Sequence, residues 1–126
     1  MKKELQDEED VRLLVRTFYN KVLNDQLIGP FFDHARKHHW EKHMEVMDKF
    51  WCNIIFFTGD YTGNPLEVHL TMHHFKPLSK DKFDRWVNLF CYTVDKLFTG
   101  PKAELAKRRA KAIAEVMQIK ILTPDP

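Results

Sequence analysis

The sequence predicts an all-α fold built as a single domain. Apolar side chains recur at intervals of three and four residues along most of the chain, which is the period of helices with one buried face. No stretch shows the strict alternation of a strand. The chain has 126 residues, of which 44% are hydrophobic and 13% aromatic, and a domain usually has about 100 to 150 residues. We therefore expect one domain over residues 1–126, with a charged leader at 1–8 and a tail at 122–126.

The first helix is predicted from an apolar stripe that follows the leader. The stripe consists of Val11, Leu14, Val15, Phe18, Val22 and Leu23. Tyr19 lies beside it. Gly29–Pro30 ends this segment, because glycine permits a positive φ and proline cannot continue a helix. The adjacent aromatic residues Phe31 and Phe32 are expected to plug the core from the turn that follows.

The next helix is predicted to run from about residue 40 to residue 57. At about 100° per residue, one arc of about 120° contains His43 and most of the large apolar side chains of this segment. These side chains are Trp40, Met47, Phe50, Trp51, Ile54 and Phe57. His43 is therefore predicted to point inward. Cys52 falls about 180° from His43, and we interpret it as a small packed thiol.

Three further helices are predicted in the second half of the chain. A short one begins at Asn64–Pro65, because Asn is a good N-cap and Pro suits the first helical position. It carries His69. Ser79 is expected to cap a longer helix, and Gly100–Pro101 separates that helix from the last one. The longer helix is predicted to bury Phe83, Trp86, Val87, Phe90, Cys91, Val94 and Leu97. The last helix is predicted to bury Leu105, Ala106, Ala112, Ile113, Val116 and Met117.

Charge and cysteine content exclude several classes of function. Lys and Arg total 20 against 18 Asp and Glu, a net charge of +2, which gives no electrostatic drive toward nucleic acid or an anionic membrane. No apolar run approaches the roughly 20 residues that span a bilayer, and the charged start does not resemble a secretory signal. Cys52 and Cys91 form neither a C-x-x-C nor a C-x-x-C-H motif, so any cofactor is expected to be held non-covalently. We expect a cytoplasmic protein with two free thiols.

Two histidines, His43 and His69, lie on separate apolar helical stripes, which suits a flat cofactor held between them. Either histidine alone is more often a hydrogen-bonded core or boundary residue than a ligand. A haem pocket needs an aromatic lining, one neutral imidazole for the iron, and hydrogen-bond donors on the opposite side. Tyr19 and Trp86 lie on or beside buried stripes and carry such donors, although each alone is as readily a packing residue. Together the four residues favour a haem pocket.

Five motifs resemble those of the truncated haemoglobins, and among these they are most similar to group III. In chain order they are Phe18–Val22, Gly29–Phe32, Trp40–His43 leading to Phe50–Trp51, His69–Leu70, and Phe83–Phe90. Each motif alone is weak, but five in the order of the family are specific, and the resemblance covers about residues 11–119. It implies a globin-like, two-over-two helical sandwich around haem b.

Carried over position by position, the resemblance implies a role for each matching residue. His69 is expected to bind the iron through Nε2 as the proximal ligand. Tyr19 and Trp86 are expected to donate hydrogen bonds to the gaseous ligand, and His43 to stand on the same distal side and gate the pocket. The residues expected to contact the haem are Phe32, His43, Met47, Trp51, His69 and Trp86.

The implied function is binding of O2 and other diatomic gases, such as CO and NO, at the haem iron. Two hydrogen bonds to a partly charged ligand, each worth about 1 to 3 kcal/mol, slow the release of O2. Slow release suits sensing, storage, dioxygenation of NO or peroxide chemistry better than transport. We expect a monomer that relies on a separate reductase for any redox reaction.

Two other classes of protein are alternatives. A non-haem helical metal protein could use the seven histidines. A di-iron bundle, however, needs inward Glu-x-x-His pairs, and neither Glu67 nor Glu115 has a histidine three positions on. A helical interaction module could use the basic run at residues 107–111. That run spreads around the helix, which favours a solvated face.

Overall fold

The computed structural model describes residues 2–32, 37–38, 40–57 and 79–122, with side chains as far as residue 119. These residues form four α-helices and one short 3₁₀ helix, and no strand is present among them. The elements are α1 (Glu8–Leu23), η1 (Gly29–Phe32), α3 (Trp40–Phe56), α5 (Lys80–Leu97) and α6 (Pro101–Leu122). The predicted all-α fold is confirmed.

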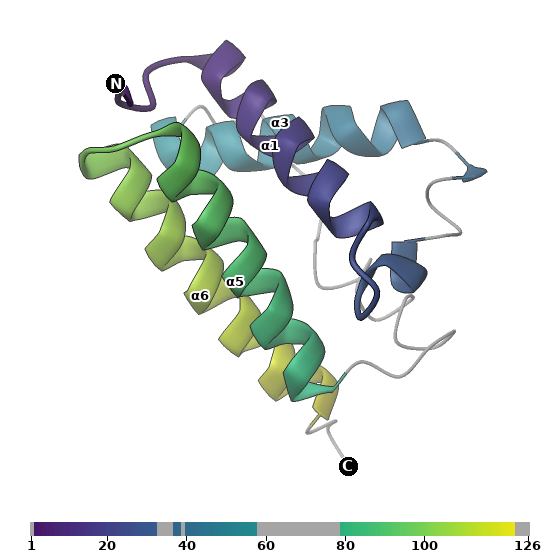
Figure 1. Ribbon diagram of the computed structural model, residues 1–126. Helices are drawn as coiled ribbons and strands as arrows, with labels where there is room; N and C mark the ends of the chain where they lie inside the picture. Colours follow the sequence, from purple (N-terminus) through teal and green to yellow (C-terminus); the bar gives the residue numbers. More distant parts are fainter. Residues whose placement is uncertain (1, 33–36, 39, 58–78, 123–126) are drawn as a thin grey trace.

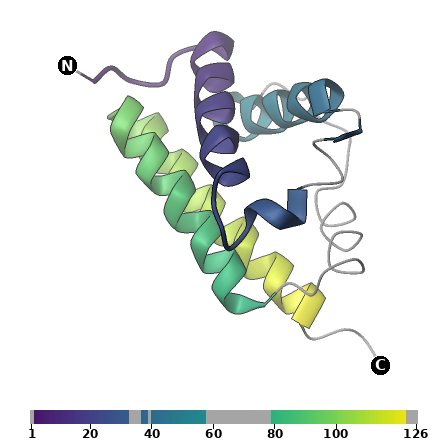
Figure 2. The same ribbon diagram turned by 45° about the vertical axis from the view of Figure 1, so that its right-hand side comes forward.

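The helices are arranged as two pairs (Figure 1). α5 and α6 run antiparallel and lie side by side, while α1 crosses α3 at the other end of the molecule. α1 also packs on α5, and α3 packs on α6, so each pair contacts the other. Figure 2 shows α1 between α3 and α5, with η1 just beyond the end of α1. The arrangement agrees with the expected two-over-two sandwich of helices.

α1 begins where Asp7 acts as its N-cap. The Oδ1 atom of Asp7 accepts a hydrogen bond from the backbone N–H of Asp10 at 2.9 Å, which satisfies one of the free donors at a helix start. The buried side chains include five of the six predicted, while Leu23 at the end of the helix is only partly buried. With two added neighbours, the buried set is Asp10, Val11, Leu14, Val15, Phe18, Tyr19 and Val22. The charged leader is itself packed, because Leu5 is buried and the N–H of Thr99 donates to the carbonyl of Lys3.

α3 buries two neighbouring sides instead of the single arc predicted. Met47 and Phe50 are buried on the side of His43, whereas a second buried side is centred about 120° further round the helix. That second side consists of Met44, Asp48, Trp51, Cys52 and Ile55. Two sides are buried because α3 packs against both α1 and α6. The prediction that Phe57 is buried is wrong: the backbone at Phe57 has a φ of 58°, α3 has already ended, and the side chain is 71% exposed.

α6 packs through small side chains, contrary to part of the prediction. Ala106 and Met117 are buried as expected, but Ala112 and Val116 are exposed. The buried stripe consists of Ala103, Ala106, Ala110, Ala114 and Met117. The distance between packed helices depends on the side chains at the contact, so a row of alanines lets α6 lie close to its neighbours. Apart from Met117, the fully buried residues of α6 are therefore alanines, and Val116 lies outside the interface.

The predicted break between the last two helices is confirmed. Gly100 has a φ of 102°, and a Cβ atom there would lie 3.1 Å from the side chain of Glu4. Only glycine adopts this conformation readily. Pro101 then occupies the first position of α6, where its missing N–H costs no hydrogen bond.

Asp25 holds the turn that joins α1 to η1. α1 ends at Leu23, earlier than the Gly29–Pro30 break, and the Asp25 side chain accepts hydrogen bonds from backbone donors within the turn that follows. Its Oδ1 accepts the N–H groups of Leu27 at 3.0 Å and Ile28 at 3.1 Å. Its Oδ2 lies 2.7 Å from the guanidinium of Arg85 on α5. Burial alone would raise the pKa of Asp25, but Arg85 and the two N–H groups outweigh it and the pKa lies below its ordinary value.

We expect Asp25→Asn to weaken the fold at neutral pH and to reduce its sensitivity to acid. The folded pKa is below the unfolded value of about 3.9, so this carboxylate stabilises the fold fully above about pH 4 and less as the pH falls through the folded pKa. The asparagine retains the turn acceptor but not the ion pair. Because Arg85 is half exposed, the loss at neutral pH should be about 1 kcal/mol.

Urea denaturation between about pH 7 and pH 2 measures this effect. Asp95→Asn is the control, since it removes an exposed carboxylate that is paired with Lys107 at 2.7 Å. If Asp25→Asn loses stability below about pH 4 as steeply as the unmodified protein, the assigned role of Asp25 is wrong.

Candidate functional site

Tyr19 lies at the centre of an aromatic cluster formed by three elements. Its ring centroid is 5.7 Å from that of Phe32 on η1, 5.9 Å from that of Trp40 and 5.7 Å from the imidazole of His43, both on α3. All three contacts are edge-to-face, the geometry that the aromatic quadrupole favours. The Tyr19 side chain is 4% exposed. Tyr19 and His43, two of the residues that the sequence placed on the distal side, are thus adjacent.

His43 points into the protein from the first turn of α3. Its Nε2 atom is fully buried, and its ring lies 5.3 Å from that of Trp40, tilted by 31°. Met47 is 7% exposed and follows one turn later on the same side of the helix. His43 and Met47 therefore share a side of α3 that is distinct from the side packed around Asp48.

Trp86 enters the site from α5 and contacts α1 through Phe18. The Phe18 ring lies 5.7 Å from that of Trp86 and 4.9 Å from that of Tyr19. The indole Nε1 atom of Trp86 is buried and makes no hydrogen bond of normal geometry with any group in the described part of the chain. Since the indole N–H can only donate, it is a buried donor in need of an acceptor.

The hydroxyl of Tyr19 is held in its neutral form. Burial raises the pKa of Tyr19 well above its ordinary value, and the nearby indole of Trp86 only partly opposes that change. Ionisation is disfavoured because a phenolate would lose its hydration in this apolar cluster. Tyr19 is therefore a proton-bearing donor across the physiological pH range.

Trp51 lies deeper, on the core side of the cluster. It is 1% exposed and stacks on Phe90 of α5 at 4.5 Å between ring centroids. The same Phe90 stacks on Trp86 at 6.0 Å. Phe18 and Phe90 thus support the site, although the sequence did not predict them as site residues. The only indication of this role in the sequence was that both belong to the predicted buried stripes.

His69, predicted as the iron ligand, lies outside the described residues, as does the helix predicted to begin at Asn64–Pro65. Of the other predicted site residues, the structure brings Tyr19, Phe32 and His43 into mutual proximity and joins Trp86 to them through Phe18. Among the described residues no three His, Cys, Asp or Glu side chains lie close enough together to hold a metal ion.

The basic run at residues 107–111 does not form one exposed patch. Lys107 lies 2.7 Å from Asp95 and 3.1 Å from Glu104, and Ala110 is buried. The run therefore contributes to the packing of α6 as well as to its surface. None of the helices in the described ranges has the length and apolar character needed to cross a membrane.

Known proteins resemble this chain over nearly its full length, although no family model matches it. The group 3 truncated haemoglobin ctb of Campylobacter jejuni is 30% identical over 121 residues, which cover 94% of this chain and 93% of that protein. The crystal structure of the group III truncated haemoglobin from Campylobacter jejuni matches with a TM-score of 0.85 and 28% identity, covering 100% of this chain and 99% of that chain. Sequence and fold agree, and this chain belongs to the group III truncated haemoglobins.

Proposed function

We propose that this protein holds haem b non-covalently and binds diatomic gases such as O2, CO and NO at the iron. Membership of a haemoglobin family implies a haem cofactor and a small gaseous ligand. The observation that carries the proposal is the buried indole N–H of Trp86, which makes no hydrogen bond of normal geometry among the described residues and lies close to the neutral hydroxyl of Tyr19. Two donors in one apolar cluster suit a ligand that carries partial negative charge.

The chemistry of the described residues fits a haem. The cluster is aromatic and apolar, as a flat hydrophobic cofactor requires, and its polar groups are few. A buried donor without an acceptor costs about 1 to 3 kcal/mol, so a native protein tolerates one where a ligand supplies the missing acceptor. The indole N–H of Trp86 is buried and makes no hydrogen bond of normal geometry among the described residues, so it is available to a ligand, and the Tyr19 hydroxyl beside it is protonated.

Each side chain then has a distinct task. His69 is proposed to hold the iron from the proximal side through Nε2. When bound, haem supplies an iron centre that takes up diatomic gases. Tyr19 and Trp86 donate hydrogen bonds to the ligand and slow its escape. His43, Phe32 and Met47 line the distal side and exclude water. Trp51 supports the cofactor from the core. The residues proposed to contact the haem are therefore Phe32, His43, Met47, Trp51, His69 and Trp86.

Slow release of the gas favours sensing, storage or reaction over transport. Dioxygenation of NO and reduction of peroxide are the reactions that such donors support, and both draw electrons from a separate reductase. We propose that the protein acts as a cytoplasmic monomer.

An absorption spectrum of the purified protein tests the proposal. After addition of haemin and reduction with dithionite, CO should give a sharp, shifted Soret band that free haemin in the same buffer does not show. A colourless protein that takes up no added haemin contradicts the proposed function.

A further inference from the structure

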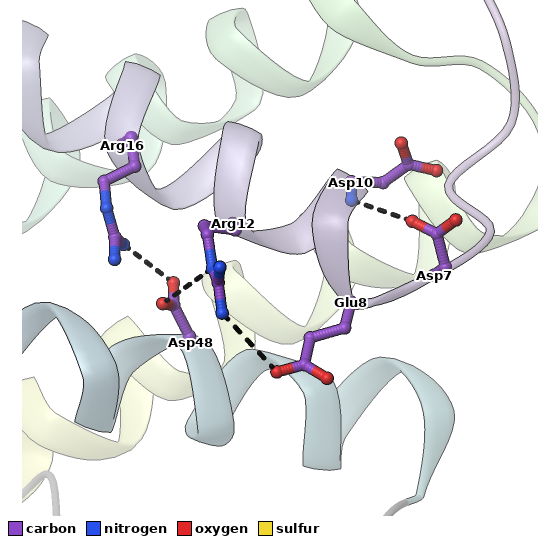
Figure 3. A network of polar contacts seen from close by, with 6 residues as sticks. All are labelled: Asp7, Glu8, Asp10, Arg12, Arg16 and Asp48. Atoms are coloured by element: carbon purple, nitrogen blue, oxygen red, sulfur yellow. Dashed lines mark hydrogen bonds and ion pairs between the residues drawn. The ribbon is translucent and has the colours of Figure 1, made fainter.

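Asp48 is a buried carboxylate on the side of α3 that packs against α1. Its side chain is 7% exposed, and the Nη1 atom of Arg16 on α1 donates to its Oδ1 at 2.9 Å. The Nε atom of Arg12, one turn earlier on α1, lies 3.8 Å from the other oxygen, and Nη2 of the same guanidinium faces Glu8 (Figure 3). Two arginines of one helix thus converge on one carboxylate of the other.

The surroundings of Asp48 are apolar. Met44, Trp51 and Ile55, one or two turns away on the same side of α3, are each at most 2% exposed. A carboxylate in such a position is stable only when it is paired, because removal from water disfavours its charge. The position of Asp48 therefore depends on where α1 places Arg16. Because the two side chains must meet, the ion pair holds α1 and α3 at one separation.

This ion pair lies close to the distal donors along both helices. Arg16 precedes Tyr19 by three residues, less than one turn, and Asp48 directly follows Met47. Tyr19 lies three residues from Arg16 on α1, and His43 lies five residues from Asp48 on α3. The rings of Tyr19 and His43 are 5.7 Å apart. Tyr19 lies on the same helix as Arg16, and His43 lies on the same helix as Asp48. Any sliding of α1 along α3 must therefore change the separation of the two rings, because each helix moves as a rigid body.

We propose that Arg16 and Asp48 are positioning residues that set the place of the Tyr19 hydroxyl relative to His43, and thereby the strength of the hydrogen bond to the gaseous ligand. The inference rests on the proposed function of the site. Neither residue touches the ligand, so both act through the register of α1 against α3. The pair Lys107–Asp95 offers a natural comparison, since it joins α5 to α6 at 2.7 Å through an Asp95 side chain that is 59% exposed.

The test compares Asp48→Asn with Asp95→Asn in the haem-reconstituted protein. Asp48→Asn should shift the infrared C–O stretch of the CO complex and raise the O2 dissociation rate roughly three- to tenfold. Asp95→Asn should change neither quantity, whatever it does to the urea midpoint. The C–O stretch reports the electrostatic field near the ligand, which a general loss of stability does not alter in a folded protein.

Arg16→Lys is the second variant, because it retains a cation beside Asp48 and is the safer change for folding. Arg16 has a side chain that is 37% exposed, so a lysine is accommodated. It should shift the C–O stretch in the same direction by a smaller amount. The inference is overturned if Arg16→Lys, and Asp48→Asn where it folds, show the same C–O stretch and the same O2 dissociation rate as the unmodified protein. An unmodified protein that takes up no haemin overturns the proposed function together with this inference, so the two failures are distinguishable.

Discussion

His69→Ala is expected to leave the protein with little bound haem. The imidazole is proposed as the one protein ligand of the iron, and alanine offers no donor atom in its place. The ratio of Soret absorbance to protein absorbance, measured after reconstitution with haemin and removal of the excess, should fall to a small fraction of its normal value. Haemin should also cease to stabilise the fold of the His69→Ala protein. In a protein that binds its ligand, a ligand concentration of 100 times the Kd adds about 2.7 kcal/mol to the free energy of unfolding.

His38→Ala provides the matched control, because His38 is an exposed histidine just before α3. Its haem uptake should be normal. A normal Soret band with an unchanged axial-ligand spectrum in the His69→Ala protein would remove His69 from its proposed role and leave the proximal ligand to another residue.

Tyr19→Phe is expected to retain haem and release O2 faster. The substitution keeps the ring that packs on Phe32 and Trp40 but deletes the hydroxyl. Because burial raises the pKa of Tyr19, the unmodified protein always presents a protonated donor to the ligand. Loss of a hydrogen bond worth about 1 to 3 kcal/mol raises the dissociation rate roughly five- to 150-fold. Stopped-flow displacement of O2 by CO measures this rate.

Tyr92→Phe is the control for this measurement, since it deletes an identical hydroxyl from a side chain that is 57% exposed on α5. Its dissociation rate should equal that of the unmodified protein. Equal rates for Tyr19→Phe and Tyr92→Phe would remove the Tyr19 hydroxyl from its proposed role.

The side of α3 that carries His43 could be predicted because it is recorded in local spacing. Residues three and four positions apart lie on one side of any helix, so His43, Met47 and Phe50 had to point together wherever α3 packed. Trp51 and Cys52 of the second buried side were predicted to pack, but Met44, Asp48 and Ile55 escaped prediction because an aspartate stands in the middle of that side. A charged residue flanked at helical spacing by Met44 and Ile55 was a usable signal of a buried ion pair, yet only the position of α1 identifies Arg16 as its partner.

The stripe of α6 shows the opposite case. By hydrophobicity Val116 was the stronger candidate for the core, but it is 55% exposed while Ala110 is 0% exposed. Small residues are buried when a neighbouring helix approaches closely, and that approach is decided by α5 and α3 rather than by α6 itself. The hydrophobicity of the α6 residues therefore ranks how readily each side chain leaves water, but it does not predict which of them contact the neighbouring helices.

The sequence by itself determined the helical class, the buried stripe of α1, the break at Gly100–Pro101 and the inward direction of His43, since each depends on residues within a few positions of one another. Only the tertiary structure decided that Tyr19 meets Phe32 and His43, that the buried indole N–H of Trp86 lies near the Tyr19 hydroxyl without a hydrogen bond of normal geometry among the described residues, and that Arg16 pairs with Asp48. The physical reason is that periodicity assigns a side chain to one side of its helix, whereas its neighbours are set by how distant helices pack.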